Sequence, residues 1–267
     1  MKLGVIGCGK MASALVEGVL KAGAFGKKEI IVSDKYPAAV KALADKTGVN
    51  TAAANADVAA GAEIILLCVK PGDALEALEA IRESPEGKLV ISILAGVTIA
   101  KLQAASGEKA RVVRVMPNTP ALVHKGAAAY STGESTTEDD AAVVEKIFSS
   151  VGTVFRVKEE LLDVVTGLSG SGPAYIYVVI EALADAGVLM GLPRDLALQL
   201  AAQTVSGAAD MVLRTGLHPA QLKDQVTSPG GTTIAGLESL EGAGIRSAFL
   251  GAVRAATERS RELGKQS

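Results

Sequence analysis

The chain has 267 residues, enough for one large domain or two domains of ordinary size. Hydrophobic residues make up 49% of it and charged residues 21%, which provides a buried core and excludes a disordered or fibrous chain. The 27 basic and 29 acidic residues nearly cancel, so neither nucleic acid nor a membrane surface is expected as a partner. The longest uninterrupted apolar run, Ala174 to Ile180, is far shorter than the ~18 residues of a membrane span.

The two cysteines, the two histidines and the N-terminal residues show no pattern of a disulfide, a metal site or a signal peptide. The chain starts at Met1 without the cleavage-site pattern of a signal peptide, so none is expected. Cys8 and Cys68 lie in or beside apolar runs, and we predict free thiols in a reducing cytoplasm. His124 and His218 lack Cys or His partners at ligand spacing, so no metal site is expected and neither receives a role.

The first half of the chain alternates short β-branched runs with helical segments. This alternation is typical of a parallel sheet that is buried on both faces. Acid, Ser and Thr in 131–140 predict an exposed loop, with Thr137 and Asp140 spaced as a capping box. The predicted strands are 2–6, 29–33, 64–69, 89–94, 112–116 and 153–157, and the predicted helices are 12–22, 38–46 and 139–150.

From Leu161 onward the strand signal nearly disappears. Long helices are predicted over 173–190, 194–215 and 243–263, with Pro173 in a first turn and Gly191 as a stop signal. The domain boundary is therefore placed at 160, with 1–160 as an α/β domain and 161–267 as an all-α domain. The helices are rich in Ala and Gly and the chain is poor in aromatics, so their faces pack either internally or against a second subunit.

The segment Ile6-Gly7-Cys8-Gly9-Lys10-Met11-Ala12 places G-x-G-x-x-A between a predicted strand and a predicted helix. Gly7 permits the tight turn, Gly9 lets a diphosphate approach bare backbone, and Ala12 lets the helix pack closely on the strand. The helix N-terminus attracts the diphosphate. Dinucleotide binding is favoured over a merely structural turn because of this context.

The second predicted strand ends in Ser33-Asp34-Lys35. An acid at this place accepts hydrogen bonds from the ribose hydroxyls of NAD and repels the 2′-phosphate of NADP, which Ser33 and Lys35 would partly offset. The alternative is that Asp34 caps the helix that starts at Pro37.

Six stretches, the glycine loop among them, are similar to pyrroline-5-carboxylate reductases over nearly the whole chain, in order and in spacing. The segment Val226–Thr233 carries the most specific of these motifs. The resemblance implies an N-terminal Rossmann-like domain with a mostly parallel sheet and an all-α C-terminal dimerisation domain, in a homodimer or a ring of dimers. The matching stretches are 6–12, 69–71, 92–97, 114–120, 170–174 and 226–233.

The resemblance also implies the site residues and the reaction, which is reduction of the C=N bond of 1-pyrroline-5-carboxylate to L-proline. NADP(H) is the favoured cofactor, with NAD(H) as a second one. Gly7, Gly9, Lys10 and Met11 would lie at the phosphates, Ser33, Asp34 and Lys35 at the adenine ribose, Asn55, Val69, Lys70 and Pro71 along the adenosine, and Ala95, Gly96, Met116, Pro117 and Asn118 at the nicotinamide end. Ser228, Gly230, Gly231, Thr232 and Thr233 would bind substrate, with Thr233 as the catalytic donor.

The residues of the 228–233 segment independently favour an anion site. Two glycines and two threonines form a turn that runs into a predicted helix, 233–240, and present N–H groups to a carboxylate. An ordinary helix start is the alternative. Lys70 follows a buried strand and is assigned to cofactor contact rather than catalysis, whereas the 170–173 segment is taken as structural with cofactor proximity as the alternative.

Two other functions compete with the imine reductase. A β-hydroxyacid dehydrogenase shares the layout but uses a lysine on an interdomain helix, and residues 161–214 contain no lysine. A non-catalytic dinucleotide sensor would not need the 228–233 segment.

Overall fold

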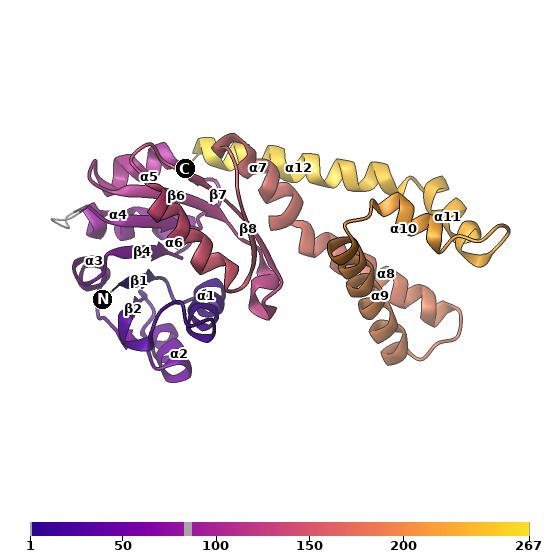
Figure 1. Cartoon of the computed structure of the whole chain (residues 1–267), viewed down its shortest axis with the longest axis horizontal. Coiled ribbons are helices and arrows are strands. Elements are labelled where there is room, and N and C mark those ends of the chain that lie inside the picture. Colours follow the sequence, from indigo (N-terminus) through magenta and orange to yellow (C-terminus); the bar gives the residue numbers. More distant parts are fainter. Residues whose placement is uncertain (1, 83–86, 267) are drawn as a thin grey trace. The chain divides into compact units, whose positions relative to one another are not determined.

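The computed structural model describes residues 2–82 and 87–266, without the side chains of 71, 75 and 266. It separates into two compact units: Met1–Ser171 together with Arg254–Ser267, and Gly172–Val253 (Figure 1). Relative to the expected boundary at 160, residues 161–171 and the last turns of the C-terminal helix lie in the first unit.

The first unit contains one eight-stranded sheet with the order β3-β2-β1-β4-β5-β6-β7-β8. Every pairing is parallel except β6 with β7, which confirms the expected mostly parallel sheet. The strands are β1 (Leu3–Ile6), β2 (Ile30–Ser33), β3 (Asn50–Thr51), β4 (Ile64–Leu67), β5 (Leu89–Ser92), β6 (Arg111–Met116), β7 (Gly126–Thr132) and β8 (Gly152–Arg156).

Helices cover both faces of this sheet, and each face has its own apolar core (Figure 1). One core joins α1 (Lys10–Lys21), α2 (Pro37–Thr47) and α6 (Glu138–Ser149) to the sheet. The other joins α3 (Asn55–Gly61), α4 (Ala74–Arg82) and α5 (Ile99–Ser106). Alternate residues of a strand point to opposite faces, and burial on both faces explains the continuous apolar runs.

The expectation of an exposed loop over 131–140 is wrong at its start. Ser131 is buried and ends, with Thr132, the antiparallel strand β7. Three consecutive alanines give β7 a weak strand propensity, so only pairing with β6 and β8 reveals it. The capping box is confirmed: the Thr137 hydroxyl accepts from the Asp140 N–H, and Asp140 accepts from the Thr137 N–H.

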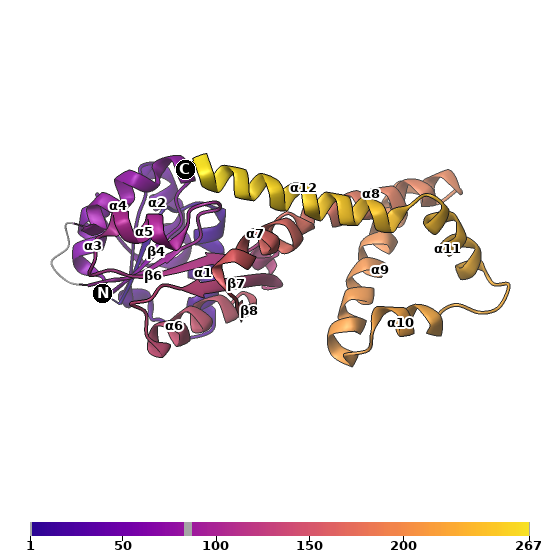
Figure 2. The same ribbon diagram turned by 90° about the horizontal axis from the view of Figure 1, so that it is seen from above.

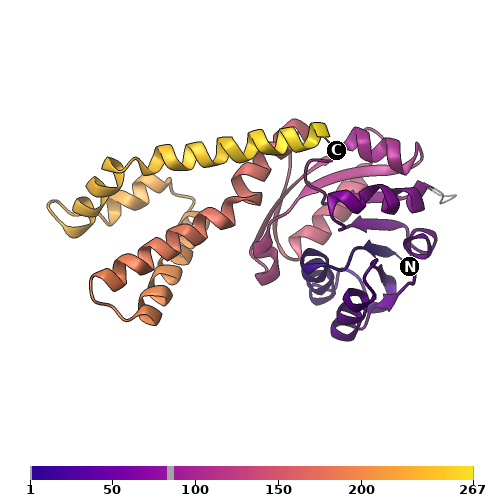
Figure 3. The same cartoon turned by 180° about the vertical axis from the view of Figure 1, so that it is seen from behind.

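The last turns of α12 (Ile245–Gln266) pack on the first unit (Figure 3). Gly96 has a φ of +76° and lies against the backbone of Gly264, where an added Cβ would be 3.3 Å from the Gly264 nitrogen. Lys101 on α5 donates to the Gly264 carbonyl at 2.7 Å. A small residue is therefore needed at both 96 and 264.

A short segment, α7 (Leu162–Val165), precedes one π-helical turn, Thr166–Gly170. Residues 172–253 then form helices without a strand (Figure 2). They are α8 (Gly172–Leu189), α9 (Arg194–Thr215), α10 (Pro219–Gln225), α11 (Thr232–Gly242) and the beginning of α12.

The core of the second unit is very small. Its buried apolar residues are Ala184, Ala197 and Ala201, while Leu189, Met190 and Leu213 are about four-fifths exposed. By length and composition, Glu159–Leu189 and Arg194–Thr215 are long and apolar enough to cross a membrane, although this is weak evidence for a span. Large apolar side chains are also exposed along α8, α9, α11 and α12, and extensive exposed apolar surface marks an interaction site.

Candidate active site

The glycine loop lies where the strand order reverses, between β2 and β4 on either side of β1. In open parallel sheets, ligands bind at the carboxyl edge of this switch point. Gly7 has a φ of +98°, and a Cβ there would be 2.7 Å from the carbonyl of Cys68. Gly9 is the N-cap of α1, has no side-chain cap, and has open space where a Cβ would point. The exposed helix N-terminus above an open glycine fits a diphosphate.

The Asp34 carboxylate accepts two backbone hydrogen bonds, one of them from the glycine loop. One carboxylate oxygen accepts from the Cys8 N–H at 2.6 Å, and the other accepts from the Tyr36 N–H at 2.8 Å. The N-cap of α2 is Tyr36, without a side-chain hydrogen bond, so Asp34 does not cap that helix. The acid instead joins the end of β2 to the loop that would hold the phosphates.

Ser33 and Asn55 form a second link at this edge. Ser33 is buried, and its hydroxyl donates to the Asn55 side-chain oxygen at 2.8 Å. The expected donation from Ser33 to a 2′-phosphate therefore requires this hydrogen bond to open. Both residues still lie next to the predicted ribose position.

A cavity of about 190 Å³ brings most of the predicted adenosine-end residues together. Gly9, Asp34, Lys35, Asn55, Val69 and Lys70 line it. Lys10, Met11 and Ser33 lie beside these residues in the chain but do not line the cavity, and the side chain of Pro71 lies outside the described residues.

Five residues of the cavity wall were not anticipated: Tyr36, Ala39, Cys68, Asp73 and Glu76. Lys35 forms an ion pair with Asp73 at 2.5 Å and lies 5.1 Å from the centre of the Tyr36 ring. The hydrogen bond that Lys35 donates to the Asp73 carboxylate raises the pKa of the Lys35 ammonium. Asp73 follows the Val69-Lys70-Pro71 stretch by two residues, and this proximity to the same sheet edge was the available signal.

The residues predicted at the nicotinamide end lie after β5 and at or just after the end of β6. Ala95 is exposed, whereas Gly96 and Pro117 are buried. Asn118 donates to the Ser169 carbonyl at 3.0 Å and accepts from the Ala127 N–H at 2.9 Å, so it anchors the π-helical turn to β7. Met116 packs against Gly170 in the same turn. Single π-helical turns of this kind are frequent at functional sites.

The predicted substrate segment lies in the second unit and has the expected shape. Gly230 has a φ of +66°, the Gly231 N–H donates to the Ser228 carbonyl, and Gly231 is the N-cap of α11. Within this fully described segment, no side chain caps α11. Thr232 is exposed and Thr233 half-buried in the first turn. The N–H groups of that turn remain available to a carboxylate.

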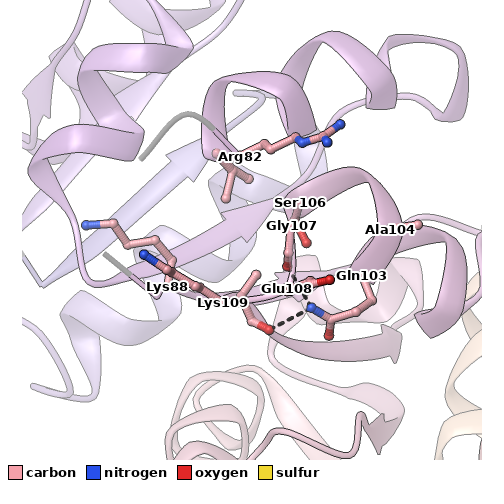
Figure 4. Close-up of a pocket in the computed structure, with 10 residues that line it drawn as sticks. Arg82, Lys88, Gln103, Ala104, Ser106, Gly107, Glu108 and Lys109 are labelled. Carbon is pink, nitrogen blue, oxygen red and sulfur yellow. Dashed lines mark hydrogen bonds between the residues drawn. The ribbon is translucent and has the colours of Figure 1, made fainter. Parts of the chain in front are cut away.

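A second polar cavity lies at the opposite edge of the sheet, where β5 and β6 begin (Figure 4). Figure 4 shows that the guanidinium of Arg82 points away from the ammonium groups of Lys88 and Lys109. Gln103 uses its amide to donate to the carbonyls of Gly107 and Ala110. The charged groups of Arg82, Lys88 and Lys109 therefore do not converge on one point of this cavity.

The thiols and histidines take no part in these clusters as reactive groups. Cys8 and Cys68 are free, as predicted, and burial raises the pKa of the Cys8 thiol to about 12. His218 accepts from the Ala220 N–H at the start of α10, and His124 ends a short turn with a φ of +57°. Among the described residues, no three His, Cys, Asp or Glu side chains are grouped as metal ligands.

A mostly parallel sheet with a glycine loop at its switch point and an acid after its second strand is typical of dinucleotide-binding proteins of the Rossmann class. A family model described as "NADP oxidoreductase coenzyme F420-dependent" matches residues 2–96. A second, described as "Pyrroline-5-carboxylate reductase dimerisation", matches residues 159–263. The first match covers the glycine loop and strands β1 to β5, and the second covers the helical unit.

Relatives match almost the entire chain. A pyrroline-5-carboxylate reductase from Methanosarcina acetivorans is 51% identical over 99% of this chain and 98% of its own length. The structure of the enzyme from Coxiella burnetii has a TM-score of 0.93 and 37% identity, covering 98% of both chains. A Plasmodium falciparum pyrroline carboxylate reductase with NADP bound has a TM-score of 0.87 and 38% identity, covering 99% and 98%. The chain belongs to the pyrroline-5-carboxylate reductase family, as the resemblance implied.

Proposed function

We propose that this chain reduces the C=N bond of 1-pyrroline-5-carboxylate to give L-proline, with a nicotinamide dinucleotide as the hydride source. The observation that carries this function is full-length similarity to pyrroline-5-carboxylate reductases, at 51% identity over 99% of the chain. The β-hydroxyacid dehydrogenase is disfavoured by the same similarity and by the missing lysine in 161–214.

The first unit holds the cofactor in this proposal. The N–H groups at the start of α1 face the diphosphate, and Gly9 leaves room for it. Asp34 is oriented by the Cys8 and Tyr36 N–H groups beside the ribose. When bound, a reduced nicotinamide would supply the hydride for the imine carbon. Met116, Pro117 and Asn118, with Ala95 and Gly96, are proposed to border that end.

The second unit holds the substrate. The first-turn N–H groups of α11, with Ser228, Gly230, Gly231 and Thr232, receive the carboxylate. The Thr233 hydroxyl donates a hydrogen bond to the ring nitrogen, where the electron pair of the C=N bond arrives. A protonated iminium reduces the need for a strong acid, so positioning and one hydrogen bond are sufficient.

The reaction is tested by following NAD(P)H absorbance with three additions: pyrroline-5-carboxylate, the 3-oxo acid that a β-hydroxyacid dehydrogenase would reduce, and buffer alone. We expect oxidation only with pyrroline-5-carboxylate. Turnover of the oxo-acid alone would support the hydroxyacid dehydrogenase, and dinucleotide binding without any turnover would support the sensor.

For the cofactor, we propose that NADP(H) is favoured and that NAD(H) is also accepted. Asp34→Asn removes the negative charge beside the proposed ribose position and keeps one of the two oxygens that accept from the Cys8 and Tyr36 N–H groups. We expect the ratio of kcat/KM with NADPH to that with NADH to rise about fivefold. Steady-state kinetics with both cofactors measure this ratio. An unchanged ratio would show that Asp34 acts on the loop and not on the ribose.

We propose a homodimer that is formed through the helical unit, and a ring of dimers as its assembly. The exposed Leu189, Met190 and Leu213 support this, because so small a core does not stabilise the unit alone. We expect sedimentation to show a dimer or a multiple of it at micromolar concentration. An active monomer would contradict the proposal.

The two apolar helical stretches are assigned to this interface and not to a membrane. The free thiols support a cytoplasmic location.

A further inference from the structure

The ion pair between Lys35 and Asp73 joins two segments of the cavity wall that are 38 residues apart in the chain. Lys35 follows β2 directly after Asp34, and Asp73 ends a short helical turn, Pro71–Asp73, after β4. The ammonium nitrogen and the carboxylate oxygen are 2.5 Å apart, and both side chains are only partly exposed, at 43% and 29%. Lys35 therefore has a partner before any ligand enters.

The charge on this wall is predominantly negative. Three carboxylates, from Asp34, Asp73 and Glu76, line the cavity with the ammonium groups of Lys35 and Lys70. The acid after the second strand of a Rossmann fold marks the ribose 2′ position. A 2′-phosphate must therefore lie beside Asp34, at the wall where Lys35 is bonded to Asp73.

We propose that Asp73 is a specificity-determining residue that weakens binding of the 2′-phosphorylated dinucleotide by holding the ammonium group of Lys35. To contact the phosphate, the Lys35 ammonium must share or break its ion pair with Asp73. The Asp73 carboxylate then faces the phosphate with an uncompensated charge. A dinucleotide without the phosphate leaves the ion pair intact. This inference rests on the dinucleotide binding of the proposed function.

The test measures binding of NADP⁺ and NAD⁺ to the full-length protein by calorimetry, without substrate and at low ionic strength. Asp73→Asn keeps the shape of the side chain and removes its charge. We expect the Kd for NADP⁺ to fall about fivefold to tenfold while the Kd for NAD⁺ changes less than about twofold. The fragments 2′,5′-ADP and 5′-AMP should show the same difference, because they differ in the same phosphate.

Two further variants separate a role of Asp73 through Lys35 from simple charge. Glu79→Gln removes the same charge from exposed surface on α4, outside the cavity, and should change neither Kd. In a Lys35→Gln background, Asp73→Asn should improve NADP⁺ binding clearly less than it does in the parental chain, because no ammonium remains to be released and only the repulsion by the Asp73 carboxylate is relieved. Raising the ionic strength should shrink the effect of Asp73→Asn.

An unchanged ratio of the two Kd values in Asp73→Asn would overturn the inference while leaving dinucleotide binding intact. An equal gain with and without Lys35 would overturn the part played by the ion pair. A parental chain that binds neither dinucleotide would instead contradict the proposed function, and the inference with it.

Discussion

Thr233→Val is expected to lower kcat by roughly ten- to a hundredfold, equivalent to about 1.4–2.7 kcal/mol of barrier, with dinucleotide binding little changed. Valine preserves the shape of threonine and removes the hydroxyl. As hydride reaches the imine carbon, the electron pair of the C=N bond moves to nitrogen. The proposed hydrogen bond from Thr233 is stronger in that state than in the ground state, so its loss raises the barrier.

The position of Thr233 in α11 makes this effect separable from stability. The helix has Gly231 as its N-cap and no side-chain cap, so the Thr233 hydroxyl is not the capping group. Removal of a capping hydroxyl would have cost about 0.5–2 kcal/mol of stability. Thr233→Ser retains the donor and should keep most of the activity. A folded Thr233→Val variant that turns over at the parental rate would restrict Thr233 to substrate positioning.

Arg114→Met is expected to destabilise the protein by about 3 kcal/mol, the low end of what removal of one partner from a buried ion pair costs. The Arg114 side chain is 5% exposed in the middle of β6 and lies 3.4 Å from Glu159 and 3.5 Å from Asp163. Glu159 also accepts from the Ile99 N–H, and Asp163 accepts from the Ser260 hydroxyl. The guanidinium thus joins β6, α7 and the end of α12.

Urea unfolding at one fixed protein concentration measures this loss, because subunit association also contributes to stability. Arg156→Met is the matched control: its ion pair with Glu138 is shorter, 2.8 Å, but the two side chains are 45% and 83% exposed. We expect that variant to lose less than about 1 kcal/mol. Asp163→Asn combined with Arg114→Met should recover part of the loss by neutralising the carboxylate left without a cation. Equal small losses for Arg114→Met and Arg156→Met would show that burial does not strengthen the Arg114 network.

Short segments whose backbone demands particular residues were predictable from the sequence alone. The turn at Gly7 leaves no space for a Cβ, and Gly230 adopts a positive φ, so both appear in the sequence as glycines before helices. The Thr137–Asp140 capping box and the apolar strands next to β1 depend on neighbours within a few residues. These local constraints sufficed for the fold class, the glycine loop and the candidate substrate turn.

Pairings between distant segments were decided only by the tertiary structure. Nothing near Ser33 in the chain indicates that its hydroxyl donates to Asn55. Likewise, nothing near Lys35 indicates that its ammonium pairs with Asp73. The alanine-rich β7 becomes a strand because β6 and β8 offer hydrogen bonds on both sides. In the sequence, Arg114 is only a charged residue within a predicted strand. Its burial is possible because the carboxylates of Glu159 and Asp163, 45 and 49 residues later in the chain, pair with it. Hydrogen bonds and ion pairs depend on distance in space, which local sequence patterns do not specify.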